Sequence, residues 1–110
     1  MEKFSLDALA REQGNKAAEA RSGRAAVTVY GGHEKALRQT LIALTEGSTL
    51  AEHENPGDAT VHVLSGRVKM IASETTWEGR KGDMLIVPPE RHSLEAMSDA
   101  AVLLTVAKRL

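Results

Sequence analysis

Two histidines and an asparagine are the residues of this chain best suited to chemistry. His53 and Asn55 lie within the segment GSTLAEHENPGDATVHVLSG, and His92 ends a second segment, GDMLIVPPERH. Imidazole nitrogens exchange protons near neutral pH and bind divalent metals, and an asparagine carbonyl adds a neutral oxygen ligand. The spacing of the two segments predicts that both histidines face one cavity. We therefore predict a small-molecule pocket formed by His53, Asn55 and His92.

The elements that position these residues are short strands. Nine apolar runs, from AAVTVY to AAVLLTVA, follow one another from Ala25 onward and are separated by turn residues such as NPGD, SG and PP. Residues 1–24 are instead rich in Ala, Glu and Arg, and Ser5 can cap a short helix that Gly14 would end. The pattern predicts an all-β antiparallel sandwich or barrel over residues 25–110, preceded by a short N-terminal helical arm over residues 1–24.

The two segments resemble the motifs of the cupin family. The first family motif runs Gly, five residues, His-x-His, three or four residues, Glu, six residues, Gly, and the second opens with Gly and has Pro six positions later, shortly before a histidine. The positions of this chain that fit are Gly47, His53, Gly66, Gly82, Pro88 and His92. The resemblance covers roughly residues 36–107. It implies a single-domain jelly roll, or double-stranded β-helix, with His53, Asn55 and His92 facing its interior.

The chain departs from the family pattern at two ligand positions. Asn55 replaces the second histidine of His-x-His, and Ala59 stands where the glutamate is expected. The interval from Pro88 to His92 is also one residue shorter than usual. A catalytic divalent ion usually has at least three protein ligands, so two imidazoles make a loose site. We therefore predict a degenerate site without a cofactor, with a bound divalent metal as the alternative.

Two functions remain open at this point. The first is a cupin-like protein that binds a small ligand and has no catalytic machinery. The second is a metal-dependent enzyme of the dioxygenase, isomerase or decarboxylase type that the resemblance implies, with His53 and His92 as ligands. The chain has no Gly-x-Ser-x-Gly nucleophile elbow, phosphate-binding loop or dinucleotide fingerprint. The sequence therefore decides neither the reaction nor the identity of the ligand.

Three further residues can be assigned by alternation or by type. His62 is out of phase with its valine neighbours and is predicted on the outer side of the barrel. Arg38 lies in the predicted strand Leu37–Leu44, and parity does not say which face of that strand looks inward. An inward Arg38 could bind an anion, and an outward one would be a surface arginine. Trp77, the only tryptophan, is predicted to be a buried anchor.

Composition limits the partners of the chain. Fourteen basic and fifteen acidic residues, without a block of like charge, give no footprint for nucleic acid or an anionic membrane. The absence of cysteine and of a long apolar run predicts a cytoplasmic protein. The runs at residues 84–87 and 100–107 are apolar on both faces, and the N-terminal arm is short and polar. We therefore predict a homodimer that covers the outer faces.

Overall fold

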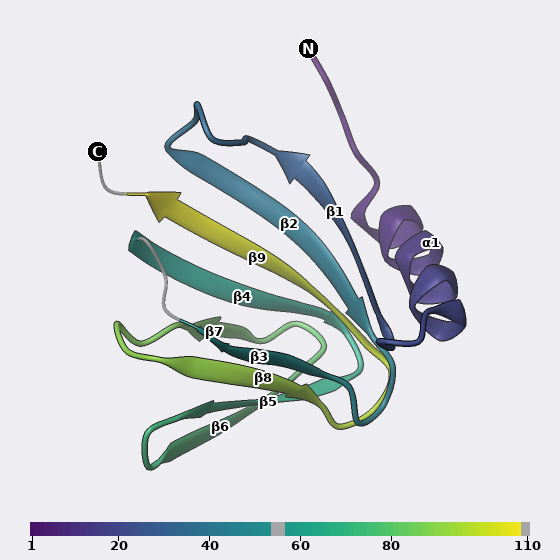
Figure 1. Ribbon diagram of the computed structural model, residues 1–110. Helices are drawn as coiled ribbons and strands as arrows, with labels where there is room; N and C mark the ends of the chain where they lie inside the picture. The colour runs from purple at the N-terminus through teal and green to yellow at the C-terminus, as the bar shows by residue number, and fades with distance from the viewer. Residues whose placement is uncertain (54–56, 109–110) are drawn as a thin grey trace.

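The computed structural model describes residues 1–53 and 57–108, and only the backbone of residues 52 and 53. Within this part the chain forms one helix and nine strands, which Figure 1 shows in two layers with the helix on one side. In chain order they are α1 (Leu6–Glu19), β1 (Arg24–Tyr30), β2 (Leu37–Leu44), β3 (Thr49–His53), β4 (Gly57–Ser65), β5 (Arg67–Ala72), β6 (Thr75–Arg80), β7 (Met84–Ile86), β8 (His92–Ala96) and β9 (Ala100–Lys108).

The strands form two antiparallel sheets that face each other. The first sheet has the order β1-β2-β9-β4-β7, and the second has the order β3-β8-β5-β6. Strands distant in sequence are therefore neighbours, because β2 pairs with β9 and β3 pairs with β8. This crossing of long connections between two sheets is the jelly-roll arrangement. It confirms the fold predicted from the spacing of the apolar runs.

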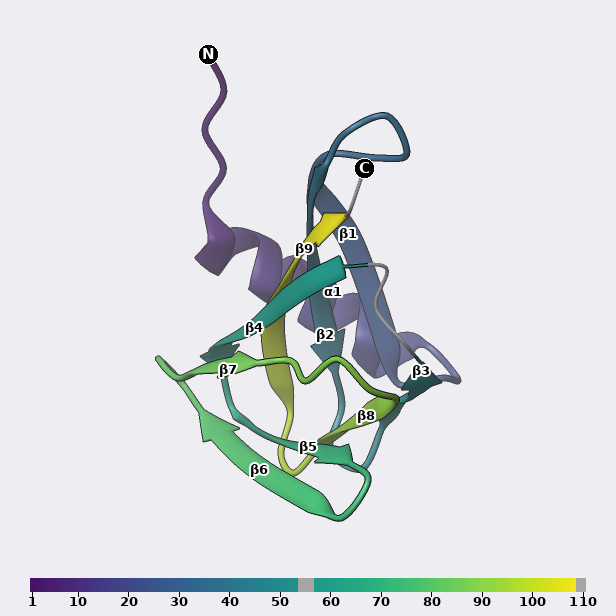
Figure 2. The same cartoon turned by 90° about the vertical axis from the view of Figure 1, so that its left-hand side faces the viewer.

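The core lies between the two sheets, in the space enclosed by the strands in Figure 2. Successive side chains on a strand point to opposite faces, so every second residue enters this space. The pattern is clearest on β4 and β5, where buried residues alternate with more exposed ones. The buried core residues on the inner faces of the strands include Leu44, Val63, Val68, Val102 and Val106.

Helix α1 covers part of the outer face of the first sheet. Its N-terminus is capped by Ser5, whose Oγ accepts a hydrogen bond from the Ala8 backbone N–H at 3.2 Å. The helix packs against β1 and β2 and touches β9, and it buries its own Gln13 and Ala17. Leu41, on the outer face of β2, is completely buried. Its ladder partner Leu103 on β9 is buried as well, so the helix side of residues 100–107, one of the runs for which the sequence predicted cover by a second copy, is partly covered by the chain itself.

The predicted end of the helix at Gly14 was wrong, because α1 continues to Glu19. A glycine inside a helix costs about 1 kcal/mol relative to alanine, which is less than the packing of an apolar helix face can return. The turns on either side of Gly14 are held against the sheet through Gln13 and Ala17. Within the described part of the chain, no helix is both long enough and apolar enough to span a membrane.

Candidate functional site

The inner faces of the strands become polar toward one end of the barrel. This end, called the mouth below, is formed by the start of β2, β4, β6 and β8 and the end of β3, β5 and β9, and it lies on the left in Figure 1. Its inner-face residues include Arg38, Ala59, Ala72, Thr75 and His92. The ladders confirm their grouping, since Ala72 is paired with both Thr75 and His92 and Val106 is paired with both Arg38 and Ala59.

His92 is a buried histidine at the first position of β8. Only 4% of its surface is exposed, and its Nδ1 lies 2.9 Å from the carbonyl oxygen of Glu90. A carbonyl oxygen can only accept, so Nδ1 carries the hydrogen and donates it. In the neutral ring the lone pair then lies on Nε2. The bond to the Glu90 carbonyl therefore fixes both the tautomer and the orientation of the His92 ring.

His53 stands opposite His92 in the ladder between β3 and β8. A regular register continued from the pair Leu50 and Leu94 would bring Glu52 to this position, but the register shifts between Leu50 and His53. The shift is a β-bulge type of irregularity, which adds one residue to one strand. The backbones of the two predicted site histidines are thereby paired directly. Sequence alternation alone did not show this shift.

The other candidate residues have different outcomes. Asn55 lies outside the described residues, so its predicted place in the pocket stays a prediction. His62 is exposed on the outer face of β4, as predicted. Ala59 lies on the inner face and is buried in the core, where its methyl group offers no donor atom.

The donors found at the mouth do not fit a three-ligand metal site. Across residues 1–53 and 57–108, no group of three or more His, Cys, Asp or Glu is placed to hold a metal ion. The family glutamate position is Ala59, which packs among valines and leucines of the core. His92 is the one described imidazole on the inner face. A metal would need donors beyond the described side chains.

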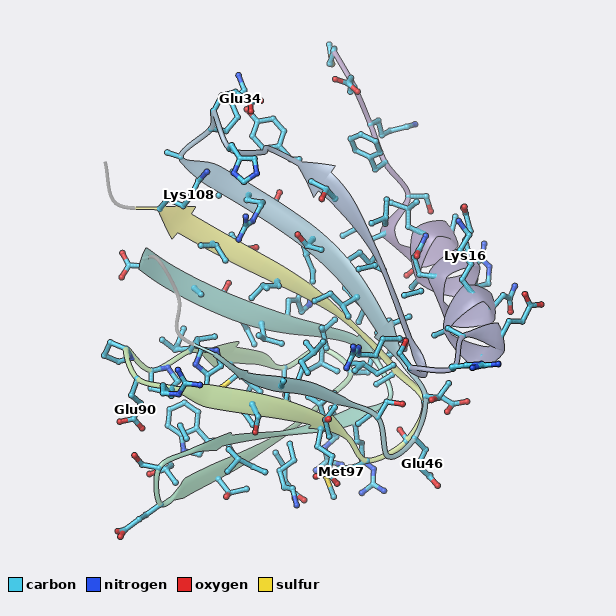
Figure 3. All side chains as sticks on the ribbon, in the orientation of Figure 1. Lys16, Glu34, Glu46, Glu90, Met97 and Lys108 are labelled. Atoms are coloured by element: carbon cyan, nitrogen blue, oxygen red, sulfur yellow. The ribbon has the colours of Figure 1, made fainter. Side chains whose placement is uncertain are left out.

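A small cavity lies beside His92 at the mouth. It has a volume of about 80 Å³ and is lined by Met70, Ala72, Thr75, Trp77, Pro88 and Glu90. Ala72 is also the ladder partner of His92, so the cavity and the histidine share a wall. Figure 3 shows Glu90 at this end of the barrel. The walls are mostly apolar, which suits one small group of a ligand rather than a large substrate.

Trp77 is not the buried anchor that the sequence predicted. It is 45% exposed and lies on the inner face of β6, paired with the buried Met70. Because β6 is the edge strand of its sheet, no further strand covers the ring on that side. Trp77 instead forms one wall of the cavity at the mouth. Sequence reasoning underrated it, although its two-residue spacing from Thr75 places both on one face.

Arg38 is on the inner face of β2. Ile42 and Leu44, which share its parity, belong to the core, and its ladder partner Val106 is also a core residue. The face of the strand Leu37–Leu44 that the sequence left open is thereby assigned. Arg38 is half-buried at the mouth.

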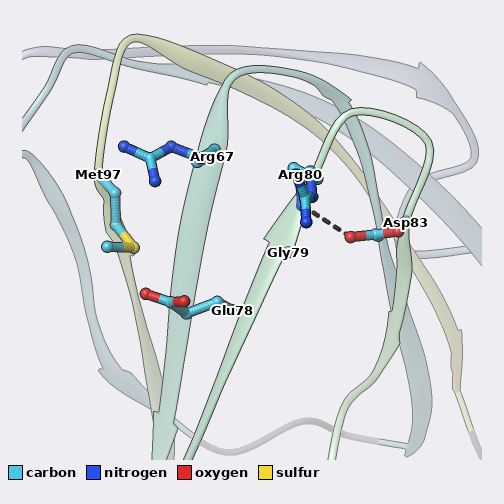
Figure 4. Close-up of a pocket in the computed structure, with 6 residues that line it drawn as sticks. All are labelled: Arg67, Glu78, Gly79, Arg80, Asp83 and Met97. Atoms are coloured by element: carbon cyan, nitrogen blue, oxygen red, sulfur yellow. Dashed lines mark hydrogen bonds between the residues drawn. The ribbon is translucent and has the colours of Figure 1, made fainter.

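A second cavity lies at the opposite end of the β3-β8-β5-β6 sheet (Figure 4). It has a volume of about 300 Å³ and is lined by Arg67, Glu78, Gly79, Arg80, Asp83 and Met97. The backbone N–H of Arg80 donates a hydrogen bond of 2.9 Å to the Asp83 carboxylate, which closes the turn beside the cavity. Positively and negatively charged side chains both line this cavity, which is called the outer cleft below. None of the predicted site residues lines it. It is therefore separate from the mouth.

The fold defines a small jelly-roll protein whose inner faces become polar at one end. The chain belongs to the cupin domain family, whose profile matches residues 40–107. This match confirms the resemblance inferred from the two glycine-to-histidine segments. No curated protein matched the chain.

Several solved structures are similar to the chain. A conserved protein of unknown function from Streptococcus pyogenes is 26% identical, with 83% of this chain and 79% of that chain covered and a TM-score of 0.74. A cupin superfamily protein from Desulfitobacterium hafniense is 16% identical, with 78% of each chain covered and a TM-score of 0.72. A cupin 2 conserved barrel domain protein from Leptotrichia buccalis is 26% identical over 77% of this chain and 41% of that chain, with a TM-score of 0.70.

Proposed function

We propose that this cupin binds a small ligand at the mouth of its barrel through His53, Asn55 and His92. The observation that carries the proposal is the burial of His92. Among the described residues, His92 and Gln13 are the only buried polar or charged side chains. Gln13 belongs to α1, which packs against the outer face of the first sheet, so it lies away from the barrel interior. An imidazole buried in a small core is unfavourable unless its polar atoms are used. The bond from Nδ1 to the Glu90 carbonyl fixes the orientation of the ring at the mouth, where a ligand would lie against it.

The surroundings of His92 support ligand binding over a purely structural role. A histidine that only fills the core would have apolar neighbours on all sides, as Val68 does at the other end of β5. His92 instead adjoins a cavity with a polar rim formed by Thr75 and Glu90. Apolar walls with a few polar groups are typical of small-molecule sites. The cavity would hold one end of the ligand, and His92 would orient it by a hydrogen bond.

The second candidate is a metal-dependent enzyme of the dioxygenase, isomerase or decarboxylase type. The direct backbone pairing of His53 with His92 favours it, because these are the two positions that the family frame assigns to metal ligands. The buried Ala59 counts against it, since it removes the carboxylate of that frame. We therefore place ligand binding without a metal first.

Thermal unfolding in the presence of a small-molecule library tests the proposal. We expect at least one compound to raise the melting temperature of the wild type, because a ligand that binds the folded state stabilises it. His92→Leu should abolish that shift. His62→Leu is the matched control, since it removes an exposed histidine from the outer face of β4 and should leave the shift unchanged. A shift that survives His92→Leu would contradict the proposed site.

Metal analysis of protein purified without a histidine tag separates the two candidates. The proposal expects no stoichiometric iron, manganese, nickel or zinc after dialysis. A retained equivalent of metal that is lost in both His53→Ala and His92→Ala would favour the enzyme instead. The variant Asn55→His/Ala59→Glu should gain metal affinity, because it restores the two missing family ligands.

A further inference from the structure

The inner face of the mouth carries an arginine that the proposed ligand contacts do not use. Arg38 lies across the barrel interior from the sheet of His92 and is half-buried. Toward the other end of β2 its face is wholly apolar, with Ile42 and Leu44 in the core. A charge at this position is partly withdrawn from water, which is unfavourable without a partner.

Arg38 has no partner of its own among the described residues. The one ion pair found there joins Lys16 to Glu12 on the exposed side of α1, and no hydrogen bond of the Arg38 side chain is found. Arg24, at the opposite end of the same sheet, behaves differently, because its Nη1 donates to the Thr49 carbonyl at 2.6 Å. The guanidinium of Arg38 thus keeps a planar set of donors that matches a carboxylate or a phosphate.

A second cation lies close to Arg38. Lys108 ends β9, two residues beyond Val106, the ladder partner of Arg38. Its Nζ donates to the carbonyl oxygens of Gly32 at 2.8 Å and His33 at 3.0 Å, and Figure 3 shows it reaching toward this loop. Carbonyls are neutral, so these bonds position the ammonium group without cancelling its charge. This part of the mouth therefore carries two positive charges. Of the described acidic residues at this end, Glu90 lines the cavity beside β6, whereas Asp58 is exposed on the outer face of β4 and Glu34 and Glu74 are exposed in the connecting loops.

We infer that Arg38 is the anion-binding residue of the mouth, and that the ligand of this cupin carries a carboxylate or phosphate group. The inference rests on the proposed function, because it assigns a chemical class to the ligand of that same site. In this arrangement Arg38 binds the anionic group bidentately, and His92 donates to or accepts from a second polar group of the ligand. Lys108 adds attraction without direct contact.

Isothermal titration calorimetry with defined probes tests this inference. Acetate, oxalate and inorganic phosphate are titrated into the full chain, and acetamide serves as the neutral counterpart of acetate. Fluorescence of Trp77, the only tryptophan, reports whether binding occurs at the mouth, because its ring lines the cavity there. Oxalate or acetate binding identifies a carboxylate site, and phosphate binding identifies a phosphate site.

Two arginine variants give the matched comparison. Arg38→Gln should weaken binding of the favoured anion by about tenfold to a hundredfold, the range for losing a hydrogen bond to a charged group. Arg67→Gln removes the same charge from the outer cleft at the other end of the barrel and should change affinity less than twofold. Arg38→Lys should give an intermediate loss, because lysine keeps the charge and loses the bidentate geometry.

The outcomes separate this inference from the proposed function. Equal binding of acetate and acetamide, or an equal effect of Arg38→Gln and Arg67→Gln, would overturn the anion site. If neutral compounds bind in a His92-dependent way under those conditions, the proposed function still stands. If the wild type binds none of the three anions, the inference fails, whether or not a neutral ligand is found. Thermal melts of each variant exclude loss of fold as the cause of weak binding.

Discussion

The two ends of this barrel are built from the same strands and differ in what their inner faces carry. At one end the inner-face residues are apolar and almost fully buried, including Leu44, Val63, Val68, Ala96 and Val102. At the mouth the same faces carry Arg38, Thr40, Thr75 and His92. The ladders that join β2 to β9 and β5 to β6 and β8 have no register shift, so only the residue types change along these strands.

This difference separates stability from binding. The apolar end contributes transfer free energy of roughly 25 cal/mol for each Å² removed from water, because its inner side chains are almost fully buried. The mouth places a buried histidine and a half-buried arginine where apolar residues would stabilise the fold more. Departures from the most stable choice are expected where a protein binds or reacts. Mutations at the apolar end should therefore lower the free energy of unfolding, and mutations at the mouth should mainly weaken ligand binding.

Truncation at the apolar end should have the largest effect on folding. We expect Leu44→Ala to lower the free energy of unfolding by about 3 kcal/mol, within the range of about 2–5 for buried leucine. Thr40→Ala, four residues away on the same face of β2, should cost less than about 1 kcal/mol, a surface-like value. Urea denaturation of both variants measures the contrast. Similar losses for the two would remove the distinction between the ends.

A glycine pair tests how tightly the backbone is packed at the apolar end, where both residues lie in connections between strands. Gly66 has a φ of +72°, and an added Cβ would lie against the backbone carbonyl oxygen of Asp99. Gly47 has a φ of +84°, but nothing lies within 4 Å of its added Cβ. Both alanine variants carry the left-handed conformation cost of about 1–2 kcal/mol. Gly66→Ala should be the more destabilising in chemical denaturation, and equal losses would show that the strand connection there yields without cost.

Substitution at the mouth should affect folding much less. His92→Leu loses the hydrogen bond from Nδ1 to Glu90, which is worth about 1 kcal/mol, and leucine gains apolar burial in return. Because Glu90 is exposed, water can replace the lost donor. We therefore expect an unfolding free energy within about 1 kcal/mol of the wild type, together with loss of ligand binding. A loss of 3 kcal/mol or more in urea denaturation would mark His92 as a structural residue.

The smallest effect on folding is expected on the outer face, where we propose that two copies of the chain pair. Helix α1 already covers β1 and β2, but Met84 and Ile86 of the edge strand β7 are 58% and 57% exposed. Exposed apolar residues on an edge strand are typical of an interface. Light scattering should give twice the 11.8 kDa mass of one chain, and Ile86→Glu should give monomers of unchanged stability. A monomeric wild type at micromolar concentration would exclude the dimer.

The sequence predicted the fold well because the fold follows from local patterns. Turn residues and short apolar runs follow one another from Ala25 onward, so the nine strands and the outward His62 could be assigned from this pattern alone. The site was harder, because it depends on how distant strands are aligned. The register shift before His53 and the inward face of Arg38 are set by pairing with β8 and β9. The exposure of Trp77 follows from the edge position of β6, which no local pattern reports.

Mapping ligand binding onto the backbone by NMR tests the central claim most directly. A ¹⁵N-labelled wild-type chain is titrated with the compound that raises its melting temperature, or with the anion that binds it best. The account predicts that chemical-shift changes concentrate at the mouth, on the amides of Arg38 and His92 and on the indole of Trp77, and that Val68 at the apolar end stays unchanged. Changes confined to the outer cleft of Arg67 and Arg80 would contradict it.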